Sequence, residues 1–356
     1  MECFSPSRDH VIATAERGIM TILLNRPAVL NSLTLCMIRD IRKALDKALT
    51  SEEIHMVILQ GSGDKAFCAG GDIKAIASAV RENRMDEAMT FFREEYALDL
   101  CIHQFPKPIV AFSDGITMGG GLGLCAGADI VIATEKTRMA MPETRIGFFP
   151  DVGATGWLFQ KCPEGYPEYL GLTGHEIKGS ETFRLGFSTH LVLTKNLEQA
   201  LSAVKEITWS SNPRKDRALG EIKSVISTFS SGDIPEDPDR DDWVRDYFSG
   251  KTSITDILFD LSQCSLHHDL CEGVFRSLSE RSPTATVLAL RLMRFNQGKS
   301  MAEVFATETK AAGFMITHRD YLEGVRARLV DKDDAPRWRP GTFEEAEKID
   351  MNQVFT

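Results

Sequence analysis

The sequence has few of the features that mark a secreted, metal-binding or redox protein. Its eight cysteines form no C-x-x-C pair, which argues against zinc ribbons and thioredoxin-type redox sites. A chain of 356 residues can bury a large core without covalent cross-links, so we expect reduced thiols in a cytosol-like compartment. The first residues, MECFSPSRDH, have no basic segment followed by an apolar run, so we expect no secretory signal.

Long apolar stretches and C-terminal address signals are equally scarce. The longest weakly charged stretch, residues 115–134, holds six glycines and Asp129, which argues against a membrane span. The final residues, QVFT, are not a peroxisomal S-K-L signal. We therefore expect no membrane partner and a cytoplasmic location, with the mitochondrial matrix as the alternative.

Charge and the absence of common motifs exclude further classes. The 41 Lys and Arg residues are outnumbered by 51 Asp and Glu, the net charge is −10, and no basic stripe occurs, so we expect no nucleic-acid partner. Neither a P-loop, a G-x-S-x-G elbow nor an H-E-x-x-H pair is present. Gly121-x-Gly123-x-x-Ala126 matches the dinucleotide pattern, but it lies well beyond the preceding strand, which makes a nicotinamide dehydrogenase the weakest alternative.

The hydrophobic pattern predicts an α/β core in the first two hundred residues. Residues 10–24 alternate around Arg17-Gly18 and predict a hairpin. Ser32 or Thr34 can cap a helix that runs to about Leu49. Short apolar runs predict buried strands at 56–59, 109–112 and 130–133. This rhythm of strands and helices predicts several parallel strand pairs.

The second part of the chain has a different pattern. We expect helices over 85–104, 197–228, 253–279, 283–295 and 300–311. The acidic segment 232–242 carries two prolines and predicts a solvated loop. We accordingly predict two domains, a catalytic core over 1–205 and a mainly helical region over 206–356.

Two glycine-rich bends could present backbone N–H groups to a ligand. Glycine has no Cβ, so the run at 119–123 lets a ligand approach the backbone closely. The bend Phe67–Asp72 could supply a second donor, and two donors on separate loops suit the oxyanion of a thioester. The alternative is that the glycines serve only tight packing, and that Asp72 is only a helix N-cap.

Four carboxylates attract attention for their positions. Glu143 and Asp151 lie eight residues apart in an apolar loop with proline and glycine, where burial would raise their pKa and suit them as base, acid or nucleophile. The alternative is that both are caps or surface residues. Glu94 and Glu95 fall in the middle of a helix, where their pattern predicts a solvated face.

Four stretches together resemble the crotonase superfamily. They are Asn25-Arg26-Pro27 with Leu30–Leu33, Ala66–Ile73, Gly115–Gly121 and Met141–Thr144. The resemblance covers residues 8–210 and implies a crotonase-like core, a superhelix of ββα units, that binds acyl-CoA thioesters. The stretches Phe91–Tyr96 and Ala140–Gly153, with the long helical C-terminal region, resemble the 3-hydroxyisobutyryl-CoA hydrolase subgroup.

The resemblance implies a role for each of several positions. The N–H groups of Ala69 and Gly120 would hold the thioester carbonyl oxygen, and Glu143 would act on the carbonyl carbon with Asp151 as acidic partner. Glu95 would line the substrate pocket, against the solvated position predicted from its pattern. The remaining substrate-binding positions implied are Gly71, Asp72, Gly119 and the loop Arg26–Asn31, which would border the adenosine of CoA.

One departure separates the chain from the hydratases of the superfamily. Hydratases carry a second glutamate at the position of Gly123 and a glycine at that of Asp151. The resemblance therefore implies hydrolysis of a short branched 3-hydroxyacyl-CoA in valine catabolism, without a cofactor other than the CoA of the substrate. Another crotonase-type hydratase or isomerase, or a catalytically silent acyl-CoA-binding protein, remains an alternative. A homo-oligomer is an open outcome, because many crotonase-like proteins form trimers or hexamers through C-terminal helices.

Overall fold

A computed structural model describes residues 9–209, 213–232 and 234–356. The first eight residues, in which we expect no secretory signal, lie outside the described residues. The chain forms two compact units. The sheet unit consists of Met1–Gly71, Ala97–Met139 and Ile177–Glu236, and the helical unit consists of Asp72–Tyr96, Ala140–Glu176 and Asp237–Thr356.

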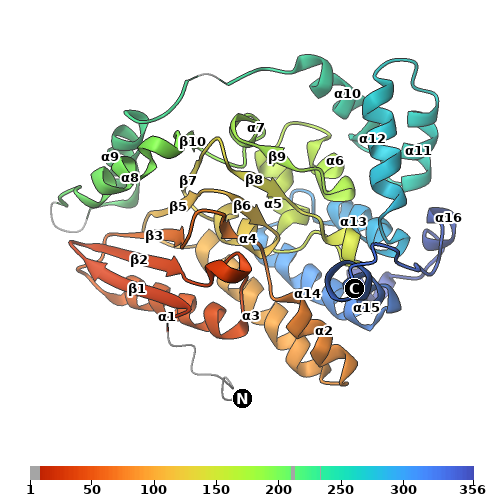
Figure 1. Cartoon of the computed structure of the whole chain (residues 1–356), viewed down its shortest axis with the longest axis horizontal. Helices are drawn as coiled ribbons and strands as arrows, with labels where there is room; N and C mark the ends of the chain where they lie inside the picture. Colours follow the sequence, from red (N-terminus) through yellow and green to blue (C-terminus); the bar gives the residue numbers. More distant parts are fainter. Residues whose placement is uncertain (1–8, 210–212, 233) are drawn as a thin grey trace. The chain divides into compact units, whose positions relative to one another are not determined.

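The sheet unit is built on six strands in the order β1-β2-β3-β5-β7-β10 (Figure 1). β1 and β2 are antiparallel, and each later neighbour in this order is parallel. The strands are β1 (Val11–Glu16), β2 (Ile19–Leu24), β3 (Met56–Gly61), β5 (Ile109–Ser113), β7 (Ile130–Ala133) and β10 (His190–Leu191). The hairpin, the parallel pairs and the α/β class predicted from the sequence are therefore confirmed.

Local sequence explains the first turns of this sheet. Arg17 and Gly18 join β1 to β2 with φ of 49° and 81°, and two positive φ values are what a two-residue hairpin turn of type I′ requires. Thr34 caps the following helix by accepting a hydrogen bond from the N–H of Met37. β3, β5 and β7 are almost wholly buried, as expected for parallel strands covered on both faces.

A second, four-stranded sheet has the order β4-β6-β8-β9 and lies next to the glycine bends in the sequence. Its strands are β4 (Ala66–Cys68), β6 (Ile116–Met118), β8 (Arg138–Ala140) and β9 (Ile177–Lys178). The helices of the sheet unit are α1 (Leu35–Thr50), α4 (Gly120–Ala126), α7 (Ser180–Arg184), α8 (Thr194–Lys205) and α9 (Lys215–Ser227), with a short 3₁₀ turn, η1 (Pro27–Val29). The helix expected over 197–228 is therefore two helices.

The helical unit contains the C-terminal helices and the loop with the candidate carboxylates. α3 (Met85–His103) contributes its first twelve residues, up to Tyr96. The other elements are α2 (Ile73–Arg81), η2 (Glu143–Ile146), α5 (Ala154–Lys161), α6 (Tyr166–Thr173), α10 (Pro238–Phe248), α11 (Ile254–Ser262), α12 (His268–Ser279), α13 (Pro283–Asn296), α14 (Met301–Thr317), α15 (Arg319–Val325), η3 (Arg326–Val330), α16 (Phe343–Ala346) and α17 (Asn352–Phe355). Figure 1 shows α11 and α12 side by side, so the helix expected over 253–279 is also two helices.

Two expectations from the sequence are wrong. The acidic segment 232–242 is not a loop throughout, because α10 begins at Pro238. Asp237 caps this helix by accepting from the N–H of Arg240, and the proline and aspartates of the first turn favour the same start. Six described cysteines are free thiols, but Cys36 is disulfide-bonded, so the expectation of reduced thiols fails there.

The domain boundary at residue 205 stays a prediction. Over the ranges that the structure describes, every helix is too short or too polar to cross a bilayer.

Candidate active site

The two glycine bends of the sheet unit touch one another. Gly70 follows β4 with φ of +100°, and a Cβ added to it would lie 3.1 Å from the carbonyl oxygen of Met118 and 3.4 Å from the nitrogen of Gly120. A Cβ on Gly121 would lie 2.2 Å from the carbonyl oxygen of Cys68. Glycine is therefore required at both places so that the bends can pack backbone against backbone.

The two N–H groups expected to hold an oxyanion differ in their hydrogen bonding. Gly120 is the first residue of α4, and its N–H has no acceptor among the residues the structure describes. The N–H of Ala69 donates to the carbonyl oxygen of Leu30 at 3.0 Å. For Ala69 to serve an oxyanion, it would have to exchange this acceptor for the substrate oxygen. Gly119 is the N-cap of α4, directly before Gly120.

The loop Arg26–Asn31 packs against the same bend. Leu33 donates its N–H to the carbonyl of Gly70 at 2.8 Å and bridges to Gly71. Asn31 is fully buried, and its amide donates to the carbonyls of Ser62 and Ala66, each at 2.9 Å. The sheet unit thus brings Ala69, Gly71, Gly119 and Gly120 together with the loop expected at the adenosine.

The helical unit buries the candidate carboxylates. Glu143 opens η2, and its Oε2 is buried without a hydrogen-bond partner among the described residues. Asp151 is 6 % exposed, and its Oδ2 accepts a hydrogen bond from the hydroxyl of Tyr96 at 2.8 Å. The prediction that both residues are buried is confirmed, and the alternative of surface residues is excluded.

Burial and mutual repulsion set the charge of this pair. Burial, followed by the nearby charge of Asp151, raises the pKa of Glu143 well above its usual range. Burial also raises the pKa of Asp151, while the hydrogen bond from Tyr96 opposes that rise. Such a pair loses its protons in two coupled steps, the second close to or above neutral pH. A carboxyl of this kind can take a proton from water and return it to a leaving group.

A cation that the sequence analysis did not identify also acts on Glu143. Arg281 is 7 % exposed and donates to the carbonyl of Thr173, and its charge lowers the pKa of Glu143. Burial lowers the pKa of Arg281 itself to about 10, so it remains charged at neutral pH. Nothing in the local sequence of Arg281 identifies this role, because it lies 138 positions from Glu143.

The two mid-helix glutamates are in different environments. Glu95 is 3 % exposed, so the solvated face predicted from its pattern is wrong, while its place in the substrate pocket stays a prediction. Glu94 is partly exposed. A signal for the burial of Glu95 was available, because it lies four residues after the buried Phe91 and so shares its helix face.

Two further residues next to Asp151 were missed. Tyr96 lies beside Glu95 on α3, and Glu308 on α14 is fully buried. Oε2 of Glu308 accepts from the N–H of Gly153 at 2.7 Å, and Oε1 accepts from the hydroxyl of Thr155 at 2.6 Å. Asp72, also expected at the substrate, stands at the N-cap of α2 without a capping hydrogen bond from its side chain.

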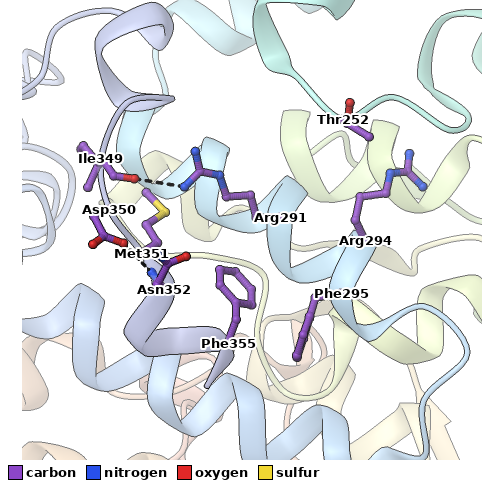
Figure 2. Close-up of a pocket in the computed structure, with 9 residues that line it drawn as sticks. All are labelled: Thr252, Arg291, Arg294, Phe295, Ile349, Asp350, Met351, Asn352 and Phe355. Atoms are coloured by element: carbon purple, nitrogen blue, oxygen red, sulfur yellow. Dashed lines mark hydrogen bonds between the residues drawn. The ribbon is translucent and has the colours of Figure 1, made fainter.

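A pocket of about 730 Å³ lies in the helical unit, and none of these carboxylates is among the residues that line it (Figure 2). Its two arginines are already engaged. Arg291 donates to the carbonyls of Glu347 and Ile349, and Arg294 pairs with the buried Glu168. Arg291 thus fastens the C-terminal tail, whereas Arg294 is engaged by Glu168 on α6. Within the described ranges, no three His, Cys, Asp or Glu side chains are grouped to hold a metal ion.

The parallel sheet with its two touching glycine bends, and the buried carboxyls of the helical unit, are features expected of a crotonase-like protein. The chain belongs to the enoyl-CoA hydratase/isomerase family, whose model matches residues 19–355. The expected family and fold are therefore confirmed.

Named relatives and solved structures agree with this membership. Mitochondrial 3-hydroxyisobutyryl-CoA hydrolase of Homo sapiens is 37% identical over 346 residues, covering 95% of this chain and 86% of that protein. Small ribosomal subunit protein mS47 of Neurospora crassa is 35% identical over 359 residues, covering 95% of this chain and 69% of that protein. An enoyl-CoA hydratase from Rhodobacter sphaeroides superposes with a TM-score of 0.83 at 30% identity, covering 97% of this chain and 95% of the other.

Proposed function

We propose that the protein is an acyl-CoA thioester hydrolase for a short branched 3-hydroxyacyl group of the 3-hydroxyisobutyryl type, and that it serves valine catabolism. The observation that carries the proposal is the buried pair of Glu143 and Asp151, in which one carboxylate oxygen of Glu143 has no hydrogen-bond partner within the part of the chain that the structure describes. Gly123, where hydratases carry a second glutamate, supports hydrolysis over hydration. The human hydrolase at 37% identity supports the substrate class.

In this proposal backbone N–H groups and carboxyl side chains supply different parts of the chemistry. The sheet unit supplies the N–H groups of Gly120 and, once released from Leu30, of Ala69, which stabilise the negative charge that develops on the carbonyl oxygen. The helical unit supplies Glu143, which either attacks the carbonyl carbon or activates a water that does so. The C–S bond breaks, and water adds OH to the acyl group and H to the sulfur of CoA.

The remaining residues have supporting roles in the proposal. Asp151 holds the hydroxyl of the acyl group or helps to position the attacking water, and Glu95 supports the polar end of the acyl pocket. Gly71, Asp72 and Gly119 border the substrate, as does the loop over residues 26–31. The reaction as proposed needs no resident metal or redox cofactor. The hydrolase relatives are named as mitochondrial, which favours the mitochondrial alternative over the cytoplasm for its location.

A catalytically silent protein is the second candidate, since one relative at 35% identity is named as a ribosomal subunit protein. The Glu143 and Asp151 pair favours the hydrolase, because a silent protein would have no need to bury two carboxyls at the cost of their desolvation. A crotonase-type hydratase is the third candidate.

One experiment separates the three candidates. The protein is incubated with 3-hydroxyisobutyryl-CoA, 3-hydroxypropionyl-CoA, isobutyryl-CoA and crotonyl-CoA, while thiol release and loss of the crotonyl double bond are followed. We expect thiol release that is fastest with the hydroxylated esters. Loss of the double bond without thiol release would identify a hydratase, and CoA binding without turnover would identify the silent protein.

The same panel tests the role of Asp151. The Asp151→Ala variant should lose about tenfold or more in kcat/KM on hydroxylated esters relative to plain isobutyryl-CoA, because a hydrogen bond to a charged group contributes about 1.5–3 kcal/mol. Equal losses on both kinds of ester would remove the recognition of the hydroxyl from the proposal.

A further inference from the structure

Tyr96 is buried by aromatic rings and directs its hydroxyl to a single partner. It is 2 % exposed, and its ring centroid lies 6.0 Å from that of Phe92 and 5.8 Å from that of Phe305. The hydroxyl donates to Oδ2 of Asp151 at 2.8 Å. Because the neighbouring rings fix the tyrosine, the hydrogen bond has a fixed direction and fixes the plane of the carboxylate in turn.

The backbone that follows Asp151 is strained, and side chains of other elements hold it by hydrogen bonds. Val152 has φ of 51°, which is an outlier for a β-branched residue. Its carbonyl accepts from Nε1 of Trp157 at 3.1 Å, and the N–H of Gly153 donates to Glu308 at 2.7 Å. The bend that carries Asp151 is therefore built to hold this carboxylate in one place.

The titratable groups around Asp151 are mostly acidic. Glu143 on η2 and Glu308 on α14 both interact with its charge, Glu95 lies next to Tyr96, and Tyr321 on α15 is also close enough to respond to it. Burial, with the charges of Asp151 and Glu308, raises the pKa of Tyr96 well above its usual range. Tyr96 therefore stays protonated and can only donate, and Arg281 is the cation that acts on the pair through Glu143.

We propose that Tyr96 is a positioning residue, whose hydroxyl holds Asp151 as an oriented anion beside Glu143 for the hydrolysis. The effect of Tyr96 on turnover rests on the proposed function, whereas the hydrogen bond from Tyr96 to Asp151 exists whether or not the protein turns over an ester. Oδ1 of Asp151, which Tyr96 does not engage, is the oxygen left to meet the substrate hydroxyl or the attacking water. The hydroxyl of Tyr96 thus sets which carboxylate oxygen of Asp151 is available to the substrate hydroxyl or the attacking water.

The variant Tyr96→Phe removes the hydroxyl and keeps the ring. A matched control is Tyr166→Phe, since Tyr166 is also fully buried in the helical unit and donates its hydroxyl to a different carboxylate, that of Asp241. In Tyr96→Phe we expect the acidic limb of kcat/KM to move to higher pH by about one unit, with at least a tenfold loss at acidic pH. Tyr166→Phe should leave the limb in place. An unmoved limb in Tyr96→Phe, or an equal movement in both variants, overturns the inference.

A second measurement does not depend on turnover. The protein is labelled with ¹³C at the aspartate carboxyl carbons, and the resonance that disappears in Asp151→Asn is titrated. We expect its midpoint to lie at higher pH in Tyr96→Phe than in the wild type and Tyr166→Phe. If the wild type releases no thiol from any ester, the proposed function fails while this titration still decides the inference. An unchanged midpoint in an active enzyme overturns the inference and leaves the function standing.

Discussion

The sheet unit and the helical unit carry their functional groups in opposite ways. In the sheet unit the proposed donors are backbone N–H groups on two glycine bends, which lack a Cβ at Gly70 and Gly121 so that the bends can touch. The helical unit presents side chains from η2, α3 and α14, and each carboxyl is shaped by residues far away in the sequence. A backbone site is specified by a short local motif, whereas a carboxylate site depends on the packing of several elements.

The proposed N–H donors and the carboxyls also differ in whether their hydrogen bonds must change before a substrate can bind. The N–H of Ala69 is bound to the carbonyl of Leu30, so one donor is engaged before any substrate arrives. Asp151 is already held by Tyr96, and Oε2 of Glu143 is already free of hydrogen bonds to the described residues. We infer that reorganisation on binding falls mainly on the backbone bends, while the carboxylates are pre-organised.

The largest expected effect comes from replacing the carboxyl of Glu143 by an amide of the same shape. Glu143→Gln should lower kcat by about 10²–10⁴-fold, the range of general acid–base catalysis. The melting temperature should change little, because the buried oxygen that is altered has no partner to lose. Steady-state thiol release and thermal unfolding measure the two effects. Glu94→Gln, a partly exposed glutamate on α3, is the control that should keep its activity. An active Glu143→Gln variant would show that the carboxylate is not the reacting group.

The next effect comes from separating the two glycine bends, where the proposed donors are backbone groups and no side chain can be removed. Gly121→Ala places a Cβ 2.2 Å from the carbonyl oxygen of Cys68, so the two bends must move apart. We expect the free energy of unfolding in urea to fall by about 3 kcal/mol, together with a loss of activity. The control is Gly220→Ala in α9, where nothing lies within 4 Å and the change should stabilise by about 0.5–1 kcal/mol. A Gly121→Ala variant as stable as the wild type would contradict the tight packing of the bends.

The same contrast explains what could be predicted from the sequence. The hairpin, a helix cap at one of two positions, Ser32 or Thr34, and the glycine-rich turn into α4 were predicted correctly, because each depends on residues close together in the chain. Glu143 and Asp151 were found from an apolar loop and from the family resemblance. Tyr96 and Glu308 were not found, because their partners Asp151 and Gly153 lie 55 and 155 residues away.

Two errors could have been avoided with local rules. Glu95 shares a helix face with Phe91 at a spacing of four, which indicates burial despite its charge. Asp237 followed by Pro238 is a helix start, although the surrounding acidic residues suggested a loop. Both interpretations followed the charge of the residues, whereas their positions relative to Phe91 and Pro238 indicated the correct structure.

The last expected effect concerns how the stability of the helical unit changes with pH, and it is spread over three pH units. Burial raises the pKa of Glu308 to about 8, whereas an unfolded glutamate titrates at about 4.3. Between these pH values the folded carboxyl keeps a proton that the unfolded chain has released, so its contribution to stability is present at low pH and is lost as pH rises. The slope is at most about 1.4 kcal/mol per pH unit. Glu308→Gln cannot titrate, so the advantage of the wild type over this variant should be largest near pH 5 and should shrink toward pH 8.

Urea unfolding from pH 5 to 8 measures this trend, and Glu303→Gln on the same helix is the control. Glu303 is exposed, and hydrogen bonds from Ser300 lower its pKa, so its contribution is lost only as pH falls through the acidic range. The control should therefore differ from the wild type by a constant amount above pH 5. If the Glu308→Gln difference is also constant, then Glu308 is ionised throughout in the folded protein, held by the N–H of Gly153 and the hydroxyl of Thr155. The carboxylate network would then carry one more negative charge beside Asp151, and the donation from Tyr96 would be needed all the more to keep Asp151 an anion.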